Sequence, residues 1–303
     1  MYLDHFGLHE LPFSLTPDTS YFLANHHCQS ALNTLLVALQ TGEGFVKITG
    51  EVGTGKTLLC RHFLNNIDHI NAQHEQDIIV SAYIPNPNLS PHELMLTLAD
   101  ELGIETNALE SHQLHRKITQ ALLDCAARGE QVVVCFDEAQ AMPMETLEAI
   151  RLLTNLETEK RKLLQIILFG QPELDQKLRH PSIRQLKQRI VFHYRLNRLN
   201  RNEVATYIHH RLRIAGYQGS PLFSHAGLHA LHHTSQGIPR LINILAHKAM
   251  MQCYGHGGKT IQARHIYAAA RDTEATHTTH YAWGIVALLL FTTALLSWKY
   301  WTQ

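Results

Sequence analysis

Between residues 44 and 196, short apolar runs alternate with longer segments in which apolar residues recur at spacings of three and four. The short runs are rich in β-branched residues and are bounded by polar or turn residues, which predicts strands. Their positions are 45–49, 77–84, 132–136, 163–169 and 190–196. The segments 91–102 and 112–127 have the helical spacing. The alternation predicts an α/β fold, with a parallel five-stranded sheet and helices on both of its faces.

From residue 200 onward, the strand pattern ends and helical patterns follow. Asn200 and Glu203 have the spacing of a capping box at the start of a helix. A second helix is expected to begin near Ser224, and Pro239 stands at the first position of a third. We therefore predict a small C-terminal α-helical lid over residues 200–271.

The stretch 282–298 (AWGIVALLLFTTALLSW) contains no charged residue and is flanked by tyrosine and tryptophan. Its 17 residues reach the lower limit for a membrane-spanning helix, and aromatic residues are typical of the bilayer edges. We predict a C-terminal transmembrane helix, single-pass, with the preceding domains in the cytoplasm; a buried or amphipathic helix is the alternative. The expected order is an N-terminal arm and helix packing on the sheet domain (1–43), the sheet domain (44–199), the lid (200–271), a linker (272–281) and the transmembrane helix (282–298).

Composition and charge change this picture little. Lys+Arg and Asp+Glu both number 26, so no global basic excess attracts a phosphate backbone, and nucleic acid is not the expected partner. The five cysteines are widely spaced without a CxxC pair, which favours a reducing compartment over a disulfide framework. Among the 23 histidines, His229, His232 and His233 come nearest to a metal-ligand set, but no Cys or carboxylate completes it. Solvated surface histidines are the plainer interpretation.

Residues 50–57 read GEVGTGKT and match the pattern G-x-x-x-x-G-K-[ST] of a P-loop. The motif follows an apolar strand and opens a helix, which is the context that the pattern requires. Its glycines let backbone N–H groups close around phosphate oxygens. Lys56 is then expected to reach the β- and γ-phosphates of ATP, and Thr57 to hold Mg²⁺. The predicted nucleotide-binding residues are Gly50, Glu51, Val52, Gly53, Thr54, Gly55, Lys56, Thr57 and Leu58.

Two carboxylates, Asp137 and Glu138, directly follow the predicted strand at 132–136. This position places them at the carboxyl edge of the sheet, beside the P-loop, where folds of this class bind ligands. Asp137 is expected to bind Mg²⁺ together with Thr57, and Glu138 to activate the attacking water. A solvated strand end is the alternative. The distance of about 80 residues from Lys56, with one strand between, favours the catalytic interpretation.

Further motifs resemble those of the AAA+ superfamily. Arg189 immediately precedes the fifth predicted strand, where that superfamily has its intersubunit arginine finger, and Arg184 is the second candidate. Arg240, in the sequence GIPR, resembles the sensor-2 arginine that reaches the γ-phosphate. Gln171 follows the fourth predicted strand at the sensor-1 position, where AAA+ proteins more often have Asn or Thr. The resemblance implies catalytic roles for these four side chains, beside Glu138.

Six segments carry a narrower resemblance: MYLDHFGLHELPFSLTPD, GEGFVKITGEVGTGKT, FDEAQ, LLQIILFGQPEL, QLKQRI and GIPRLIN, in this order within residues 1–271. Together they resemble the ExeA/GspA-type secretion ATPases. The sequence ends five residues after 298, which is similar to the shorter branch that serves mannose-sensitive haemagglutinin (MSHA) type IV pili. The resemblance implies an inner-membrane AAA+ ATPase that forms a homo-oligomer with assembly proteins of a pilus or type II secretion complex. It also implies that residues 6–17 lie near the adenine.

Two other classes stay open. DNA-binding AAA+ proteins of the transposition-helper or replication-initiator kind share this core, although no helix-turn-helix or winged-helix domain is evident after the lid. The second class is a nucleotide-dependent scaffold that binds ATP and hydrolyses it negligibly. The intact Glu138 and Arg189 argue against this class. The residues do not determine the assembly partner, the oligomer number or the pathway.

Overall fold

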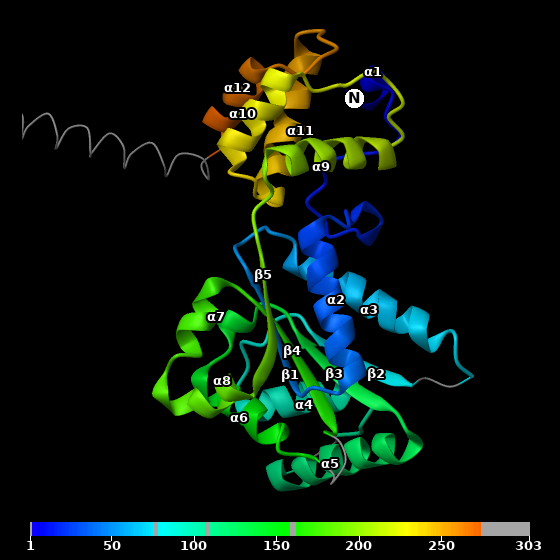
Figure 1. Ribbon diagram of the computed structural model, residues 1–303, viewed down its shortest axis with the longest axis vertical. Coiled ribbons are helices and arrows are strands. Elements are labelled where there is room, and N and C mark those ends of the chain that lie inside the picture. Colours follow the sequence, from blue (N-terminus) through cyan, green and yellow to red (C-terminus); the bar gives the residue numbers. More distant parts are fainter. Residues whose placement is uncertain (1, 76–77, 107–109, 158–161, 274–303) are drawn as a thin grey trace, which may run out of the picture. The chain divides into compact units, whose positions relative to one another are not determined.

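The computed structural model describes residues 2–75, 78–106, 110–157 and 162–273. They divide into two compact units. Pro17–Asn197 form the first, called the sheet unit below, and the described residues of Met1–Thr16 and Arg198–Gln303 form the second, called the helical unit. Figure 1 shows a twisted sheet flanked by helices in the sheet unit and a bundle of helices in the helical unit.

Five parallel strands form the sheet, in the order β2-β3-β4-β1-β5. They are β1 (Phe45–Gly50), β2 (Ile79–Ile84), β3 (Gln131–Phe136), β4 (Leu164–Gly170) and β5 (Ile190–Leu196). The prediction of five parallel strands is confirmed: the bounds of β5 are those predicted, and those of the other four strands differ by one or two residues. Asp77, where the second predicted strand starts, lies outside the described residues.

Helices cover both faces of the sheet, as predicted. One face packs against α2 (His26–Thr41) and α3 (Lys56–Asn71), and the other against a larger set of helices. That set comprises α4 (Pro91–Glu101), α5 (Ser111–Arg128), α6 (Met144–Leu153), α7 (Pro172–Lys177) and α8 (Arg184–Arg189). Strands such as β3 and β4 are buried on both faces, which explains why their sequences are continuous apolar runs.

The helical unit contains α1 (Tyr2–Phe6), α9 (Arg201–Ile214), α10 (His225–Ser235), α11 (Pro239–Gly255) and α12 (Ala263–Arg271). The predicted capping box is present, because Asn200 accepts from the N–H of Glu203, and the Glu203 carboxylate accepts from the N–H of Asn200. Ser224 caps α10 and Pro239 opens α11, also as predicted. Residues 200–271, predicted as an α-helical lid, are therefore helical in their described elements and belong to the helical unit.

The structure corrects the predicted packing of the N-terminal arm. The sequence predicted that residues 1–43 pack on the sheet domain, but Met1–Thr16 group with the helical unit and only the part from Pro17 onward groups with the sheet. The Tyr2 hydroxyl and His247 Nδ1 share a hydrogen bond of 2.8 Å, and the Phe13 ring packs edge-on against Phe223. Aromatic residues of the arm bury their apolar surface among these helices, and a sequence pattern does not say which domain offers that surface.

Within residues 2–273, apart from the gaps stated above, no helix has both the length and the apolar character needed to cross a bilayer. The predicted transmembrane helix at 282–298 lies outside the described residues. Of the predicted linker at 272–281, residues 274–281 lie outside them as well, whereas Asp272 caps the end of α12 and Thr273 is buried.

Candidate functional site

The P-loop connects β1 to α3, in the context that the sequence predicted. Gly53 and Gly55 have φ angles of +80° and +96°, which a residue with a Cβ rarely adopts. A Cβ on Gly50 would lie 2.7 Å from Thr54 Oγ1, so this glycine is needed for the tight turn. Gly55 is the N-cap of α3 and no side chain caps it, which leaves the first N–H groups of the helix free to receive an anion. Of the remaining predicted loop residues, Val52 is exposed, and Glu51 and Leu58 are half-buried.

Lys56 lies inside this loop and is 5% exposed. Its Nζ donates to the carbonyl oxygens of Gly50 and Glu51, both at 2.9 Å. Burial lowers the pKa of Lys56, and the negative charges of Glu138 and Asp137 oppose that shift. The ammonium group is thus held in place by two neutral acceptors, which phosphate oxygens can replace with charge-assisted hydrogen bonds.

Thr57 and Asp137 come together, although about 80 residues separate them in the sequence. The Thr57 hydroxyl donates to Asp137 Oδ2 at 2.6 Å, and the N–H of Glu138 donates to Asp137 Oδ1 at 2.9 Å. Asp137 is 2% exposed, and burial raises its pKa while these hydrogen bonds oppose the shift. A hydroxyl and a carboxylate side by side at a phosphate-binding loop are the oxygen ligands that Mg²⁺ uses with nucleotides, so the donor set fits Mg–ATP.

Glu138 follows in the left-handed backbone region, with φ of +50°, which is uncommon for a residue other than glycine. Its carboxylate accepts from two side-chain amides: Gln171 Nε2 at 2.9 Å and Gln140 Nε2 at 2.5 Å. Gln140 Oε1 also accepts from the N–H of Gln171 at 2.9 Å. Gln171, predicted at the sensor-1 position, therefore contacts the predicted general base directly.

Gln140 is the residue of this site that the sequence interpretation missed. The available signal was its position two residues after Glu138, in a turn at the carboxyl edge of the sheet. Its hydrogen bond with the N–H of Gln171 ties the turn after β3 to the residue that follows β4. Its other hydrogen bond, together with that of the Gln171 amide, holds the Glu138 carboxylate.

The two candidate finger arginines differ in environment. Arg189 is half-buried, and its guanidinium donates to three groups at the C-terminal end of α6. These are the carbonyl oxygen of Arg151 at 3.2 Å, Thr154 Oγ1 at 2.7 Å and the side-chain oxygen of Asn155. Arg184 is exposed at the start of α8. Arg189 thus has a structural role within its own chain, and a role in trans stays a prediction for both side chains.

Arg240 is exposed in the first turn of α11, in the helical unit. The glycine of its GIPR motif has a φ of +73°, and a Cβ there would lie 2.0 Å from the carbonyl oxygen of Leu199. Gly237 also accepts a backbone hydrogen bond from Leu199 at 2.9 Å. The glycine therefore serves close packing within the helical unit. The sensor-2 role of Arg240 stays a prediction because the P-loop belongs to the other unit.

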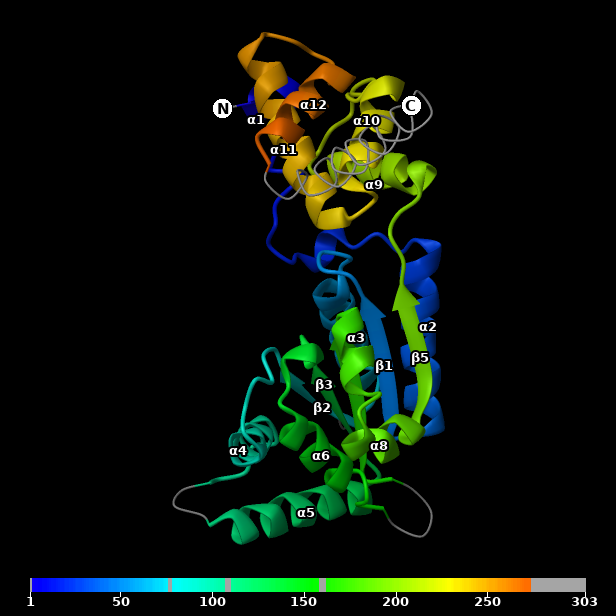
Figure 2. The same cartoon turned by 90° about the vertical axis from the view of Figure 1, so that its left-hand side faces the viewer.

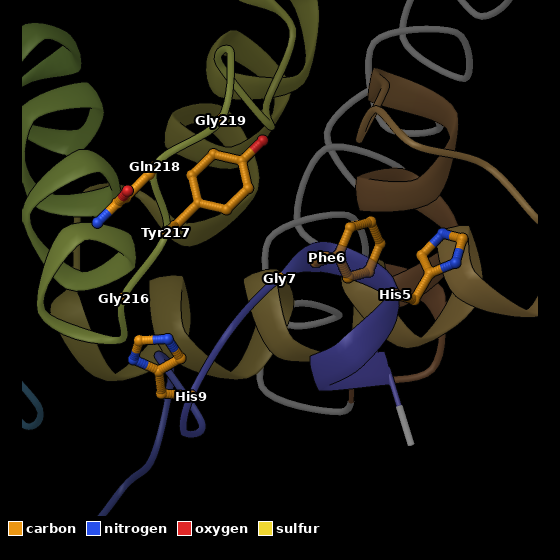
Figure 3. Close-up of a pocket in the computed structure, with 8 residues that line it drawn as sticks. All are labelled: His5, Phe6, Gly7, His9, Gly216, Tyr217, Gln218 and Gly219. Atoms are coloured by element: carbon orange, nitrogen blue, oxygen red, sulfur yellow. The ribbon is translucent and has the colours of Figure 1, made fainter.

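A cavity of about 560 Å³ in the helical unit lies between the N-terminal arm and the turn after α9 (Figure 3). His5, His9 and Tyr217 are among the residues that line it, and none of its lining residues is Lys, Arg, Asp or Glu. It therefore lacks the charged groups that the P-loop brings together. In the described part of the chain, no group of three or more His, Cys, Asp or Glu residues is arranged to hold a metal ion, and this includes His229, His232 and His233.

Comparison with solved structures confirms the fold. The Aeropyrum pernix ORC2 protein superposes with a TM-score of 0.61 at 16% identity, covering 80% of this chain and 66% of that one. The Aeropyrum pernix ORC1 protein in complex with DNA superposes with a TM-score of 0.62 at 15% identity, covering 86% of this chain and 69% of that one. The Thermotoga maritima RuvB Holliday junction branch migration motor superposes with a TM-score of 0.54 at 15% identity, covering 82% of this chain and 70% of that one. At such identities the likeness concerns the fold alone.

Sequence comparison is more specific. The family model described as AAA domain matches residues 39–178. General secretion pathway protein A of Aeromonas hydrophila is 39% identical over 306 residues, which cover 99% of this chain and 54% of that protein. The chain thus spans about half the length of this curated relative. With its P-loop, paired carboxylates and five-stranded sheet, the chain belongs to the ExeA/GspA-type family of AAA proteins.

Proposed function

We propose that this protein hydrolyses ATP at the P-loop and the carboxylates of β3. The observation that carries the proposal is the hydrogen bond between Thr57 and Asp137, which joins the phosphate-binding loop to the acidic strand end. Bound Mg–ATP would supply a γ-phosphoryl group whose charge the metal partly neutralises. Lys56 would exchange its two carbonyl acceptors for phosphate oxygens, while Thr57 and Asp137 would hold the metal.

Glu138 would orient the attacking water and accept its proton. In the observed arrangement its carboxylate accepts from Gln140 and Gln171, so these amides set the position from which it acts. A further positive charge would come from an arginine, supplied by Arg189 or Arg184 of a neighbouring subunit in a homo-oligomer. Arg240 of the lid is the sensor-2 candidate.

The test of hydrolysis is phosphate release by the full chain with Mg–ATP, for the wild type, Lys56→Ala and Glu138→Gln. We expect Lys56→Ala to lose both binding and turnover. Glu138→Gln should keep ATP affinity but lose turnover by roughly 10²–10⁴-fold, the range for removal of a general base. Equal phosphate release in all three proteins would show that another site, or a contaminant, is responsible.

We propose further that the ATPase acts at the inner membrane, anchored by the apolar stretch 282–298, and supports assembly of an MSHA-like type IV pilus or a type II secretion complex. The 39% identity to General secretion pathway protein A supports a secretion-related pathway, and the uncharged stretch supports anchoring. Expressed in bacteria, the full chain should stay with the membrane after alkaline extraction, whereas a chain ending at residue 275 should not. Proteins that co-purify with Glu138→Gln but not with Lys56→Ala would identify the assembly partner.

A DNA-binding AAA+ protein is the second candidate, because solved relatives of this fold include the ORC1 protein in complex with DNA. The balanced total charge does not favour it. Fluorescence anisotropy with a labelled DNA duplex decides between them. Salt-dependent binding at physiological ionic strength would favour this candidate, and no binding would exclude it.

A further inference from the structure

The helical unit carries charge of mostly one sign, in a chain whose total charge is balanced at 26 and 26. Residues 204–271, which hold most of α9 and all of α10, α11 and α12, contain no Asp or Glu. Arg211 is buried and Lys248 is half-buried, and the other basic residues of this stretch are exposed. These exposed residues are Arg213, Arg240, Lys259, Arg264 and Arg271.

Two of these arginines lie on one face of α12, the last helix among the described residues. Arg264, Tyr267 and Arg271 follow one another at spacings of three and four, and all three are exposed. The opposite face of the helix is buried, because α12 packs against α10 and α11 (Figure 2). The exposed face is thus a row of arginine, tyrosine and arginine, called the basic stripe below.

The acidic residue next to the basic stripe is already paired. Asp272 directly follows Arg271, and its carboxylate accepts from Lys248 Nζ at 2.8 Å. The hydrogen bond and positive charge of Lys248 lower the pKa of Asp272. Glu203, the nearest acidic residue before the stripe in the sequence, accepts from the N–H of Asn200 in the cap of α9. The two arginines therefore give the stripe a positive charge that suits an anionic partner.

The place of α12 in the chain indicates which anionic partner the stripe meets. Arg264 and Arg271 come 18 and 11 residues before residue 282, where the uncharged stretch 282–298 begins. Lys and Arg within about 15–20 residues of a membrane span gather on its cytoplasmic side. Only residues 274–281 separate Thr273 from that stretch, and a chain of this length spans at most about 30 Å when fully extended. With 282–298 in the bilayer, as proposed above, the end of α12 lies no farther than this from the membrane.

The chemistry of the stripe fits a membrane surface with anionic phospholipids. Guanidinium groups bind phosphate oxygens in pairs of hydrogen bonds, and a tyrosine ring sits well where apolar and polar regions meet. Arg264 and Arg271 are two helical turns apart, about 10 Å along the axis, so both reach headgroups when α12 lies along the surface. Each basic residue near such a surface strengthens binding by about fivefold. Two arginines are enough here, because the short connection to the span keeps α12 at a high effective concentration beside the bilayer.

We propose that α12 docks on the anionic face of the membrane through Arg264, Tyr267 and Arg271. The contact holds the helical unit at the bilayer, in addition to the anchor at 282–298. It rests on the anchoring part of the proposed function and is independent of ATP hydrolysis. Its test therefore measures docking and anchoring separately.

The test is hydroxyl-radical footprinting of the full chain, with oxidation of single side chains measured by mass spectrometry. The chain is reconstituted into vesicles of phosphatidylcholine alone and of phosphatidylcholine mixed with phosphatidylglycerol. Tyr267, 45% exposed, reports on the stripe, and Tyr217, half-buried in the turn after α9, is the internal reference. We expect oxidation of Tyr267 relative to Tyr217 to slow by at least about threefold when phosphatidylglycerol is present. Raising the salt should reduce this protection.

Three double variants identify the groups responsible. Arg264→Glu with Arg271→Glu should remove the protection, whereas Arg264→Lys with Arg271→Lys should keep it because the charge stays. The matched control, Arg201→Glu with Arg213→Glu, reverses two exposed charges of α9 and should behave like the wild type.

Equal oxidation of Tyr267 in the two kinds of vesicle would overturn the docking. Protection that persists in Arg264→Glu/Arg271→Glu, or that extends equally to Tyr217, would overturn it as well. Protection of Tyr267 by a DNA duplex, with none from phosphatidylglycerol, would assign the stripe to nucleic acid instead. Alkaline extraction of the same vesicles tests the anchor: a chain that stays in the membrane with Tyr267 unprotected refutes the docking alone, and a chain that is released refutes the anchoring.

Discussion

Replacing Arg189 with alanine separates a structural role from a catalytic one. Its guanidinium donates to the carbonyl oxygen of Arg151 and to the side chains of Thr154 and Asn155, at the C-terminal end of α6. A cation at this end of a helix also interacts favourably with the helix dipole. Arg189→Ala removes these interactions together and leaves the acceptors to water.

The size of the stability loss caused by Arg189→Ala follows from these contacts. A hydrogen bond that involves a charged group contributes about 1.5–3 kcal/mol when buried, and the helix dipole about 0.3–1 kcal/mol. Arg189 is only half-buried, and a cavity of about 160 Å³ beside it lets water reach the freed acceptors. The contributions do not add fully, so we expect Arg189→Ala to lower the free energy of unfolding of the sheet unit by about 2 kcal/mol. For a unit of this size the melting temperature should fall by about 4–8 °C.

Thermal unfolding followed by circular dichroism measures the change, with Arg184→Ala as the matched control. Arg184 is exposed at the start of the same helix, α8, and its substitution should change stability by less than about 0.5 kcal/mol. An Arg189→Ala protein that melts with the wild type would refute the structural assignment. For catalysis, an arginine that acts in trans should lower turnover with ATP affinity intact, and mixing with Glu138→Gln should recover part of the activity. If only Arg184→Ala behaves in this way, Arg184 is the finger.

Three further substitutions test the site and the lid. Gln140→Ala removes one of the two amides that hold the Glu138 carboxylate. We expect kcat to change by at least about threefold with little change in nucleotide affinity, and an unchanged kcat would exclude a positioning role for Gln140. Asp137→Asn relieves the cost of burying a charge, so the nucleotide-free protein should be at least as stable as the wild type, but Mg–ATP should no longer raise its melting temperature. Gly237→Ala places a Cβ against the Leu199 carbonyl oxygen in a left-handed turn and should destabilise the helical unit by about 3 kcal/mol or more, measured by urea unfolding; a smaller change would mean that the turn can move.

Much of the nucleotide site could be predicted because its information is local. The P-loop is contiguous, its glycines have the backbone angles that the motif requires, and Asp137 and Glu138 directly follow an apolar strand. Helix ends could be predicted for the same reason, because their signals lie within a few consecutive residues, as the capping box at Asn200 and Glu203 shows. The transmembrane helix at 282–298 stays a prediction, since it lies outside the described residues.

What the sequence by itself determined was the chemistry: which residues can bind a phosphate, hold a magnesium ion or accept a proton, and which runs can form strands. Tertiary structure decided which of them meet. Gln140 joins Glu138 to Gln171, and Arg189 is bound by α6, only because β3, β4 and β5 take their places in the sheet. The arm at the N-terminus joins the helical unit for the same kind of reason. Apolar patterns show that a surface must be buried, but only the packed fold supplies the partner that buries it.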